Sequence, residues 1–303
     1  MIVIVAATSE VAIPTLERIS KSEHQLLRII STPDSKSGRG KVLTPSPVSN
    51  WAETKGVALL KPNSIQEMQE AFLGADIVLA ISYGRILDKK ILEIPKHGFL
   101  NLHFSLLPAY RGAAPVQRAI ANGDSTSGIT IFKIDENLDT GPIYVQEKYE
   151  IPNLASSDQV LEKLSNIGAL AFERAFAMIA SSVSPVEQSS EGISFAPKIT
   201  KHEAKINWNQ SADKILYSIR AFTSAPGAWT LFRGSTVKIT SASIGKFPDV
   251  ISPAELRVHD RRLFIGTQDD PIEIFTIIPS GKQLMKVGDW INGARLNLGE
   301  YFE

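Results

Sequence analysis

Cysteine is absent from the 303-residue sequence. The absence excludes disulfide bonds, thiolate metal sites and a cysteine nucleophile. Neither sign of charge is in excess, because 32 lysines and arginines balance 32 aspartates and glutamates, so no global field draws the chain to nucleic acid or to a membrane. No stretch approaches the roughly 18 consecutive apolar residues that span a bilayer, and no basic segment precedes the apolar start of the chain. We therefore expect a soluble, cytoplasmic protein without a membrane partner.

Short apolar runs are present through the first 150 residues, and amphipathic segments separate them. The runs are Ile2 to Ala7, Gln25 to Ile30, Val57 to Leu60, Ile77 to Ile81, Phe99 to His103 and Ile129 to Ile134. The helix candidates are Val11 to Ile19, Pro47 to Lys55, Ile65 to Leu73, Lys89 to Ile94 and Ala114 to Asn122. Unalternating runs separated by helices predict an α/β domain with a Rossmann-like, largely parallel sheet covered on both faces.

The pattern changes after a long helix predicted over Ser157 to Ala180. A Ser-rich stretch, residues 181–190, follows and is interpreted as part of a linker. Beyond it a helix is predicted at Ala212 to Phe222, and closely spaced short strands predict a small β barrel or sandwich. These strands are Trp229 to Phe232, Val237 to Ser241, Leu256 to His259, Arg261 to Ile265 and Ile272 to Ile277. The predicted boundaries are 1–185, a linker at 186–207, and 208–303.

Positive charge is locally concentrated although the total is balanced. Residues 198–246 contain eight basic and two acidic side chains. A second basic segment, Lys36, Arg39 and Lys41, lies among glycine and proline with no acid between Ser35 and Asn50. Both segments fit solvated surfaces as well as a polyanion-binding face.

The most informative stretch is Asn101 to Pro115 (NLHFSLLPAYRGAAP), joined later by residues 138–142 (LDTGP). Asn101 and His103 are two residues apart at a predicted strand end, so their side chains share one face. Acyl transfer to an amine needs an uncharged nucleophile, oxyanion stabilisation and a proton acceptor. An amide and a protonated histidine meet the second need. Asp139 beside His103 would raise the proton affinity of the imidazole and could take the proton of the amine. Taken singly, these residues equally fit a turn, a surface position and a cap.

Together, Asn101-Leu-His103, Ser105-Leu-Leu-Pro108, Arg111-Gly-Ala-Ala-Pro115 and Leu138-Asp139-Thr-Gly141 resemble the folate-dependent formyltransferase family. The resemblance implies catalytic roles for Asn101, His103 and Asp139. It also implies that a four-residue stretch binds tetrahydrofolate, namely Ser105, Leu106, Leu107 and Pro108. The implied formyl donor is the co-substrate 10-formyltetrahydrofolate. No metal site is expected, because the five histidines show no ligand spacing.

Residues 32–48, with the core Ser37-Gly-Arg39-Gly-Lys41, resemble a loop that family members acting on methionyl-tRNA place against the tRNA. Lysine and arginine in such a glycine-containing loop can approach phosphates closely. Residues 196–208 resemble the segment that joins the catalytic domain to an OB-like C-terminal domain, where Lys198, Lys201 and Lys205 would form one basic stripe on a helix. The resemblance thus implies tRNA contacts at Lys36, Arg39, Lys41, Lys198, Lys201 and Lys205. The expected reaction formylates initiator methionyl-tRNA for translation initiation, and a monomer is expected.

Two departures from the family pattern accompany this resemblance: Ala6-Ala7-Thr8-Ser9 lacks a Gly-Thr-Pro turn, and Ser49 replaces a basic residue. Ala6 to Ser9 also lacks the glycine-rich phosphate turn of a nicotinamide oxidoreductase, which argues against that class. A glycinamide ribonucleotide formyltransferase would match only the first domain. Two alternatives stay open: a formyltransferase acting on an amino-sugar nucleotide or other small amine, and a non-catalytic RNA-binding protein.

Overall fold

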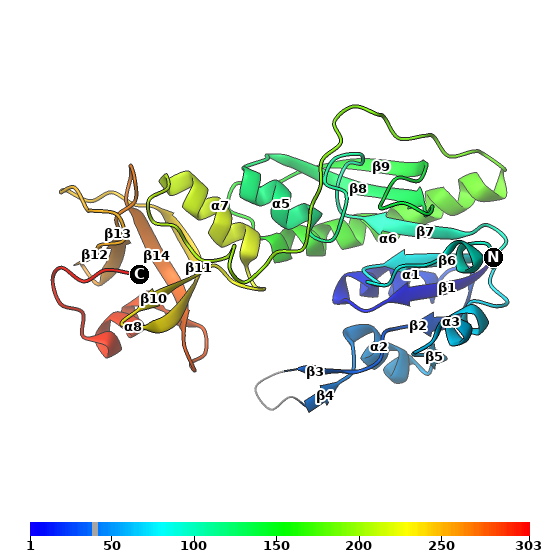
Figure 1. The fold of residues 1–303 in the computed structure, drawn as a ribbon, viewed down its shortest axis with the longest axis horizontal. Coiled ribbons are helices and arrows are strands. Elements are labelled where there is room, and N and C mark those ends of the chain that lie inside the picture. The colour runs from blue at the N-terminus through cyan, green and yellow to red at the C-terminus, as the bar shows by residue number, and fades with distance from the viewer. Residues whose placement is uncertain (38–41) are drawn as a thin grey trace. The chain divides into compact units, whose positions relative to one another are not determined.

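The computed structural model describes residues 1–37 and 42–303, which pack into two compact units (Figure 1). Unit 1 comprises residues 1–115, 127–150 and 161–197, and unit 2 comprises residues 116–126, 151–160 and 198–303. These units describe packing. The boundaries predicted from the sequence, 1–185, 186–207 and 208–303, stay a prediction about independently folding parts.

Unit 1 contains a seven-stranded sheet in the order β5-β2-β1-β6-β7-β8-β9 (Figure 1). The five strands from β5 to β7 run parallel, and β8 pairs antiparallel with β7. This largely parallel sheet confirms the predicted α/β fold. Its strands are β1 (Ile2–Ala7), β2 (Gln25–Ile30), β5 (Leu59–Leu60), β6 (Ile77–Ile81), β7 (Phe99–His103), β8 (Thr126–Lys133) and β9 (Ile143–Glu150).

Several helices of unit 1 begin at polar caps that sequence periodicity alone does not fix. Ser46 Oγ accepts a hydrogen bond from the Ser49 amide at 3.0 Å, and Gly56, at φ 66°, ends the same helix. Such caps satisfy backbone groups that the helix itself leaves free. The elements are η1 (Glu10–Ala12), α1 (Ile13–Ile19), α2 (Pro47–Lys55), α3 (Ile65–Ala71), α4 (Lys89–Leu92) and α6 (Ser157–Ala180), the last belonging to this unit from residue 161 onward.

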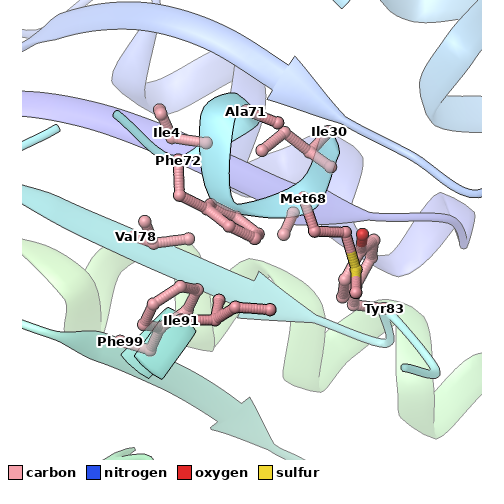
Figure 2. Packing of buried hydrophobic residues seen from close by; sticks show 10 residues of the cluster. Ile4, Ile30, Met68, Ala71, Phe72, Val78, Tyr83, Ile91 and Phe99 are labelled. Carbon is pink, nitrogen blue, oxygen red and sulfur yellow. The ribbon is translucent and has the colours of Figure 1, made fainter. Parts of the chain in front are cut away.

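One hydrophobic cluster anchors the sheet to α3 and α4 (Figure 2). Phe72 and Phe99 meet edge to face with ring centroids 4.9 Å apart, and both are fully buried. Ile4, Ala6, Ile30 and Val78 supply the sheet side of the cluster, while Met68, Ala71 and Ile91 supply the helix side. Burying such side chains stabilises the fold by about 25 cal/mol for each Å² of apolar surface removed from water. The cluster therefore holds β1, β2, β6 and β7 against α3 and α4.

Unit 2 contains an antiparallel sheet in the order β10-β11-β14-β13-β12, with β15 paired to β14. Trp208, Phe232, Trp290 and Phe302 make its aromatic core, with Trp208 stacked on Phe302 at 5.5 Å. This small β unit agrees with the predicted OB-like architecture. Its elements are α5 (Pro115–Asn122, from its second residue), α7 (Ala212–Phe222), β10 (Trp229–Phe232), β11 (Ser235–Ile244), β12 (Leu256–His259), β13 (Arg262–Ile265), β14 (Ile272–Pro279), β15 (Met285–Lys286) and α8 (Val287–Ala294).

Several elements match their predicted ranges, and others were not predicted. The helices α6 and α7 have the predicted bounds, whereas β9, α8 and the short pair β3 (Ser35–Ser37) and β4 (Val42–Thr44) were missed.

The departure at Ser49 has a structural explanation, because this residue is fully buried and its hydroxyl hydrogen-bonds to Ser46 at 2.9 Å. Ser49 therefore presents no surface to a partner. No helix within residues 1–37 and 42–303 combines the length and the apolar character that a membrane span requires.

Candidate active site

Asn101 and His103 lie at the carboxyl end of β7, on the face of the sheet opposite α6. The α6 face is marked by Leu102, because a Cβ on Gly168 of α6 would lie 2.5 Å from Leu102 Cδ2. Side chains alternate along a strand, so Asn101 and His103 project from the other face, as the sequence predicted. In open α/β sheets this carboxyl edge is where ligands bind.

The His103 ring is buried, with 5% of the residue exposed, and is fixed by a backbone partner. Its Nε2 lies 2.8 Å from the Tyr110 carbonyl oxygen. Because a carbonyl can only accept, Nε2 carries the hydrogen and donates it. In the neutral ring the other nitrogen, Nδ1, then has a free lone pair, which faces Asp139 Oδ2 at 3.7 Å. The structure therefore leaves room for one proton between the imidazole and the carboxylate.

Burial lowers the pKa of His103 from its usual 6.5, and this effect outweighs the opposing influences of the Asp139 charge and the Tyr110 carbonyl. The raising effect that the sequence analysis expected from Asp139 is present. It is the smaller effect, however, because removing the charged imidazolium from water costs more than the carboxylate returns. In the free protein the imidazole is thus neutral near pH 7, whereas the sequence analysis assigned oxyanion stabilisation to a protonated histidine.

Asp139 belongs to a turn that close packing holds in place. Its Oδ2 accepts a hydrogen bond from the Gly112 amide at 2.7 Å, and its backbone has φ 52°, which aspartate tolerates better than most residues. Gly141 ends the turn so close to β8 that an added Cβ would lie 1.7 Å from the Lys133 carbonyl oxygen. The glycine of the Leu-Asp-Thr-Gly motif is therefore required by a backbone approach. The predicted proximity of Asp139 and His103 is observed.

The Asn101 carboxamide is half-buried and has no hydrogen-bond partner among the residues that the structure describes. Across the sheet Asn101 is level with Ala80 of β6, which is level with Ala6 of β1. An amide without a partner, at the carboxyl edge of the sheet, is suited to donate to a ligand oxygen.

The stretch 105–108 forms a loop whose interior members hold its shape. Ser105 is buried and its hydroxyl donates to the Ala109 carbonyl at 2.6 Å; Leu107 is buried as well. Thr130 Oγ1 donates to the Ser105 carbonyl at 2.7 Å and accepts from the Leu107 amide at 3.1 Å. Leu106 and Pro108 are half-exposed. Of the residues predicted to bind folate, these two are free to meet a ligand with their side chains, while Ser105 and Leu107 shape the loop.

The predicted tRNA-contact residues fall in two places. Arg39 and Lys41 lie outside the described residues, and Lys36 is in β3, paired with Leu43 of β4. In unit 2 the predicted stripe on a helix is not formed, since the backbone carrying Lys198, Lys201 and Lys205 is irregular. Lys201 and Lys205 instead lie over the Trp229 ring, 5.6 and 5.7 Å from its centroid. The three lysines therefore do not form a single stripe on a helix, and the RNA contacts of all six basic residues stay a prediction.

The sequence analysis missed several residues that support the site. Thr130 and Gln146 hold the 105–108 loop, Gln146 through a bond from Nε2 to the Leu107 carbonyl at 2.9 Å. Gln188 and Ser194 bond to the turns around Asp139 and Tyr110. No local signal marks them, because each acts on residues at least 23 positions away. No group of three or more His, Asp or Glu side chains that could hold a metal ion is found within residues 1–37 and 42–303.

An unengaged amide, a buried imidazole and a neighbouring carboxylate at a strand end form a site suited to acyl-group transfer, and the sequence places it in one family. The chain belongs to the formyl transferases: residues 1–175 match the family described as "Formyl transferase", and residues 198–295 match "Formyl transferase, C-terminal domain". Over its whole length the chain is 39% identical to "Methionyl-tRNA formyltransferase" of Thermobifida fusca, of which it covers 99%.

Solved structures share the fold at lower identity. An N-formyltransferase from Helicobacter canadensis, in complex with folinic acid and dTDP-3-aminofucose, superposes with a TM-score of 0.68 at 21% identity, covering 90% of this chain and 99% of that one. HypX from Aquifex aeolicus, in complex with tetrahydrofolic acid, gives a TM-score of 0.68 at 16% identity over 99% of this chain. This chain spans about half the length of HypX, 48%. At such identities the likeness concerns the fold alone.

Proposed function

We propose that this protein transfers the formyl group of 10-formyltetrahydrofolate to the free amino group of initiator methionyl-tRNA, giving N-formylmethionyl-tRNA in the cytoplasm. The observation that carries the proposal is the buried His103 imidazole, whose Nδ1 lies 3.7 Å from Asp139 Oδ2, on the same strand β7 as the Asn101 amide, which has no hydrogen-bond partner among the described residues. Identity of 39% to a relative named for this reaction supports the choice of acceptor.

Asn101 has the chemistry to stabilise the oxygen of the formyl group. As the amine attacks, negative charge grows on that oxygen, and a side-chain amide that is already oriented can donate to it at little reorganisation cost. Because the backbone of Asn101 is held in β7 between β6 and β8, the fold fixes the point from which this amide projects. Loss of this amide would destabilise the transition state more than the bound ground state.

His103 and Asp139 can accept and return the proton that the reaction moves. A bond forms between the formyl carbon and the amine nitrogen, and the bond from that carbon to the folate nitrogen breaks. The amine must lose one proton, and the departing nitrogen must gain one. The lone pair of His103 Nδ1 and the carboxylate of Asp139 can accept the first proton, directly or through a water molecule, and later return it. The pair then regains its starting state.

The folate would lie against the 105–108 loop, where Leu106 and Pro108 present half-exposed apolar side chains. Folate supplies the activated one-carbon unit when it binds. Hydrogen bonds from Thr130 and Gln146 hold the loop before any ligand arrives, which reduces the ordering cost of binding. We propose Ser105, Leu106, Leu107 and Pro108 as the folate-binding stretch on this basis.

For the tRNA we propose contacts from Lys36, Arg39, Lys41, Lys198, Lys201 and Lys205, with the protein acting as a monomer. Lys198, Lys201 and Lys205 are all exposed. Lys201 and Lys205 flank the half-buried Trp229 ring, and a cationic surface around an aromatic ring suits both phosphate and base.

The test is a formyl-transfer assay with 10-formyltetrahydrofolate as donor and two acceptors in parallel, charged initiator methionyl-tRNA and a dTDP-amino sugar. We expect turnover with the tRNA at least about 100-fold above that with the sugar. Formylation of the sugar alone would assign the protein to the amino-sugar enzymes, and tRNA binding without turnover of either acceptor would leave a non-catalytic RNA-binding protein.

Arg39→Ala tests the RNA contact separately. A lost phosphate contact should raise KM for the tRNA and reduce the slope of log affinity against log salt by about 1, while donor KM stays unchanged. An unchanged salt slope would remove Arg39 from the RNA contacts, even if formylation of the tRNA is observed.

A further inference from the structure

Residues 186–196, which we call the strap, run across the active-site loops of unit 1. One end pairs with β9, where Val186 and Ile143 exchange two backbone hydrogen bonds of 2.7 and 2.9 Å. At the other end the Arg111 amide donates to the Ser194 carbonyl at 2.9 Å, and the Ala196 amide donates to the Arg111 carbonyl at 2.7 Å. Because both ends are fixed by backbone pairs, the strap holds Gln188 at a constant position over the site.

The Gln188 amide makes three hydrogen bonds from that position. Its Oε1 accepts from Arg111 Nη2 at 2.6 Å, and its Nε2 donates to the Asp139 carbonyl at 2.8 Å and to the Gly141 carbonyl at 2.9 Å. A guanidinium only donates and a carbonyl only accepts, so the amide has one permitted orientation. Gln188 thus connects the Arg111 side chain with both ends of the Asp139 turn.

Arg111 explains why a glutamine serves here. This arginine is 9% exposed, its Nε is buried without a partner, and among residues 1–37 and 42–303 no carboxylate lies within ion-pair distance of it. A buried guanidinium usually pairs with an acid. Here it donates to the Gln188 amide oxygen, which polarises that amide and strengthens its donation to the two carbonyls. The charge is thereby used to hold the turn.

The turn needs such support because its geometry is demanding. Asp139 has a positive φ of 52°, and its carboxylate must stay 3.7 Å from His103 Nδ1. Gly112, the residue after Arg111, fixes one carboxylate oxygen through its amide. The backbone behind that carboxylate is fixed by Gln188. Gly112 therefore restrains the side chain of Asp139, and Arg111, acting through Gln188, restrains its main chain.

We infer that Gln188 is a positioning residue for the formyl transfer proposed above: linked to the buried Arg111, it fixes the turn that keeps the Asp139 carboxylate beside His103. The inference rests on the proposed function for its kinetic consequence. Its geometric consequence, the distance of a negative charge from the His103 ring, can be measured without turnover.

Two variants separate positioning from folding. Gln188→Met keeps the length of the side chain but removes the donors to the turn and the acceptor for Arg111. Gln188→Glu removes the same donors and keeps an acceptor for Arg111, so it protects the fold. Glu187→Gln, at the exposed neighbouring position of the strap, is the matched control.

The kinetic readout is the split between kcat and KM. Small displacements of a catalytic group can cost up to about 100-fold in rate, so we expect kcat to fall at least about 10-fold in both Gln188 variants, with donor KM within about threefold and the Glu187→Gln protein unchanged. A kcat within threefold of the wild type in a folded Gln188→Glu protein would overturn the inference. So would an equal loss of kcat and donor affinity that follows the loss of thermal stability.

The second readout is the titration of His103 by NMR, assigned by comparison with His103→Gln. Asp139 raises the pKa of the His103 imidazole against the lowering effect of burial, so releasing the turn in Gln188→Met should lower that pKa further. An unchanged titration refutes the positioning role, whether or not the wild-type protein turns over. Absence of turnover in the wild type with a shifted titration would instead refute the proposed reaction and leave the placement of Asp139 by Gln188 standing.

Discussion

Replacing Asp139 by asparagine removes one charge from the site and keeps most of its shape. Asparagine is isosteric with aspartate, and its side-chain oxygen can still accept the Gly112 amide that Asp139 Oδ2 accepts at 2.7 Å. The hydrogen bond from the Gln188 side-chain Nε2 to the backbone carbonyl of residue 139 is also retained. The substitution therefore tests the carboxylate charge beside His103 with the position of the turn unchanged.

The size of the effect follows from the 3.7 Å separation of His103 Nδ1 and Asp139 Oδ2. Two unit charges at that distance attract by about 4 kcal/mol when the effective dielectric constant is about 20. If half of this attraction stabilises the positive charge that builds up on the imidazole, its loss costs about 2 kcal/mol, or roughly 30-fold in rate. Losing the proton acceptor as well adds a factor of about 100 or more.

The assay is kcat for formyl transfer to charged initiator tRNA at saturating donor, with donor binding measured separately. We expect Asp139→Asn to lower kcat by at least about 100-fold while donor affinity changes less than threefold. A loss near 30-fold would leave Asp139 with an electrostatic role only. A kcat within fivefold of the wild type would contradict both roles of Asp139, because neither the charge nor the proton acceptor would then matter.

Two further changes test the folded state around the site. The pKa of His103 is lowered on folding from the usual 6.5, chiefly by burial, so the unfolded chain binds the extra proton first. Stability should therefore be lost as the pH falls from about 6.5 towards the folded pKa, by at most about 1.4 kcal/mol per pH unit. Urea midpoints of wild type and His103→Gln at several pH values should converge on acidification, and parallel curves would contradict the burial argument. Gly141→Ala places a Cβ 1.7 Å from the Lys133 carbonyl oxygen and should cost about 3 kcal/mol or more. Gly293→Ala, in α8 with no atom within 4 Å of the added Cβ, should be neutral or stabilising by up to about 1 kcal/mol. Equal melting temperatures of these two variants would argue against the close approach.

Local patterns in the sequence are sufficient to predict much of the fold. The helices α6 and α7 and the strands β1, β2, β6 and β7 were predicted at their observed bounds, because long apolar periodicities and buried runs are local properties. The missed elements lack such signals. The strand β9 is half-exposed, and the eight-residue helix α8 contains two glycines, which have low helix propensity.

The chemistry available to this protein can be read from its residues: no thiol, an amide and an imidazole on one strand face, and a Leu-Asp-Thr-Gly turn that matches one family. How those groups behave depends on the folded arrangement. It brought Asp139 within 3.7 Å of His103, lowered the pKa of that ring by burial, and used Gln188, from a segment interpreted as a linker, to hold the turn. These outcomes depend on desolvation and on contacts between residues far apart in the chain, and neither quantity is encoded in a local pattern.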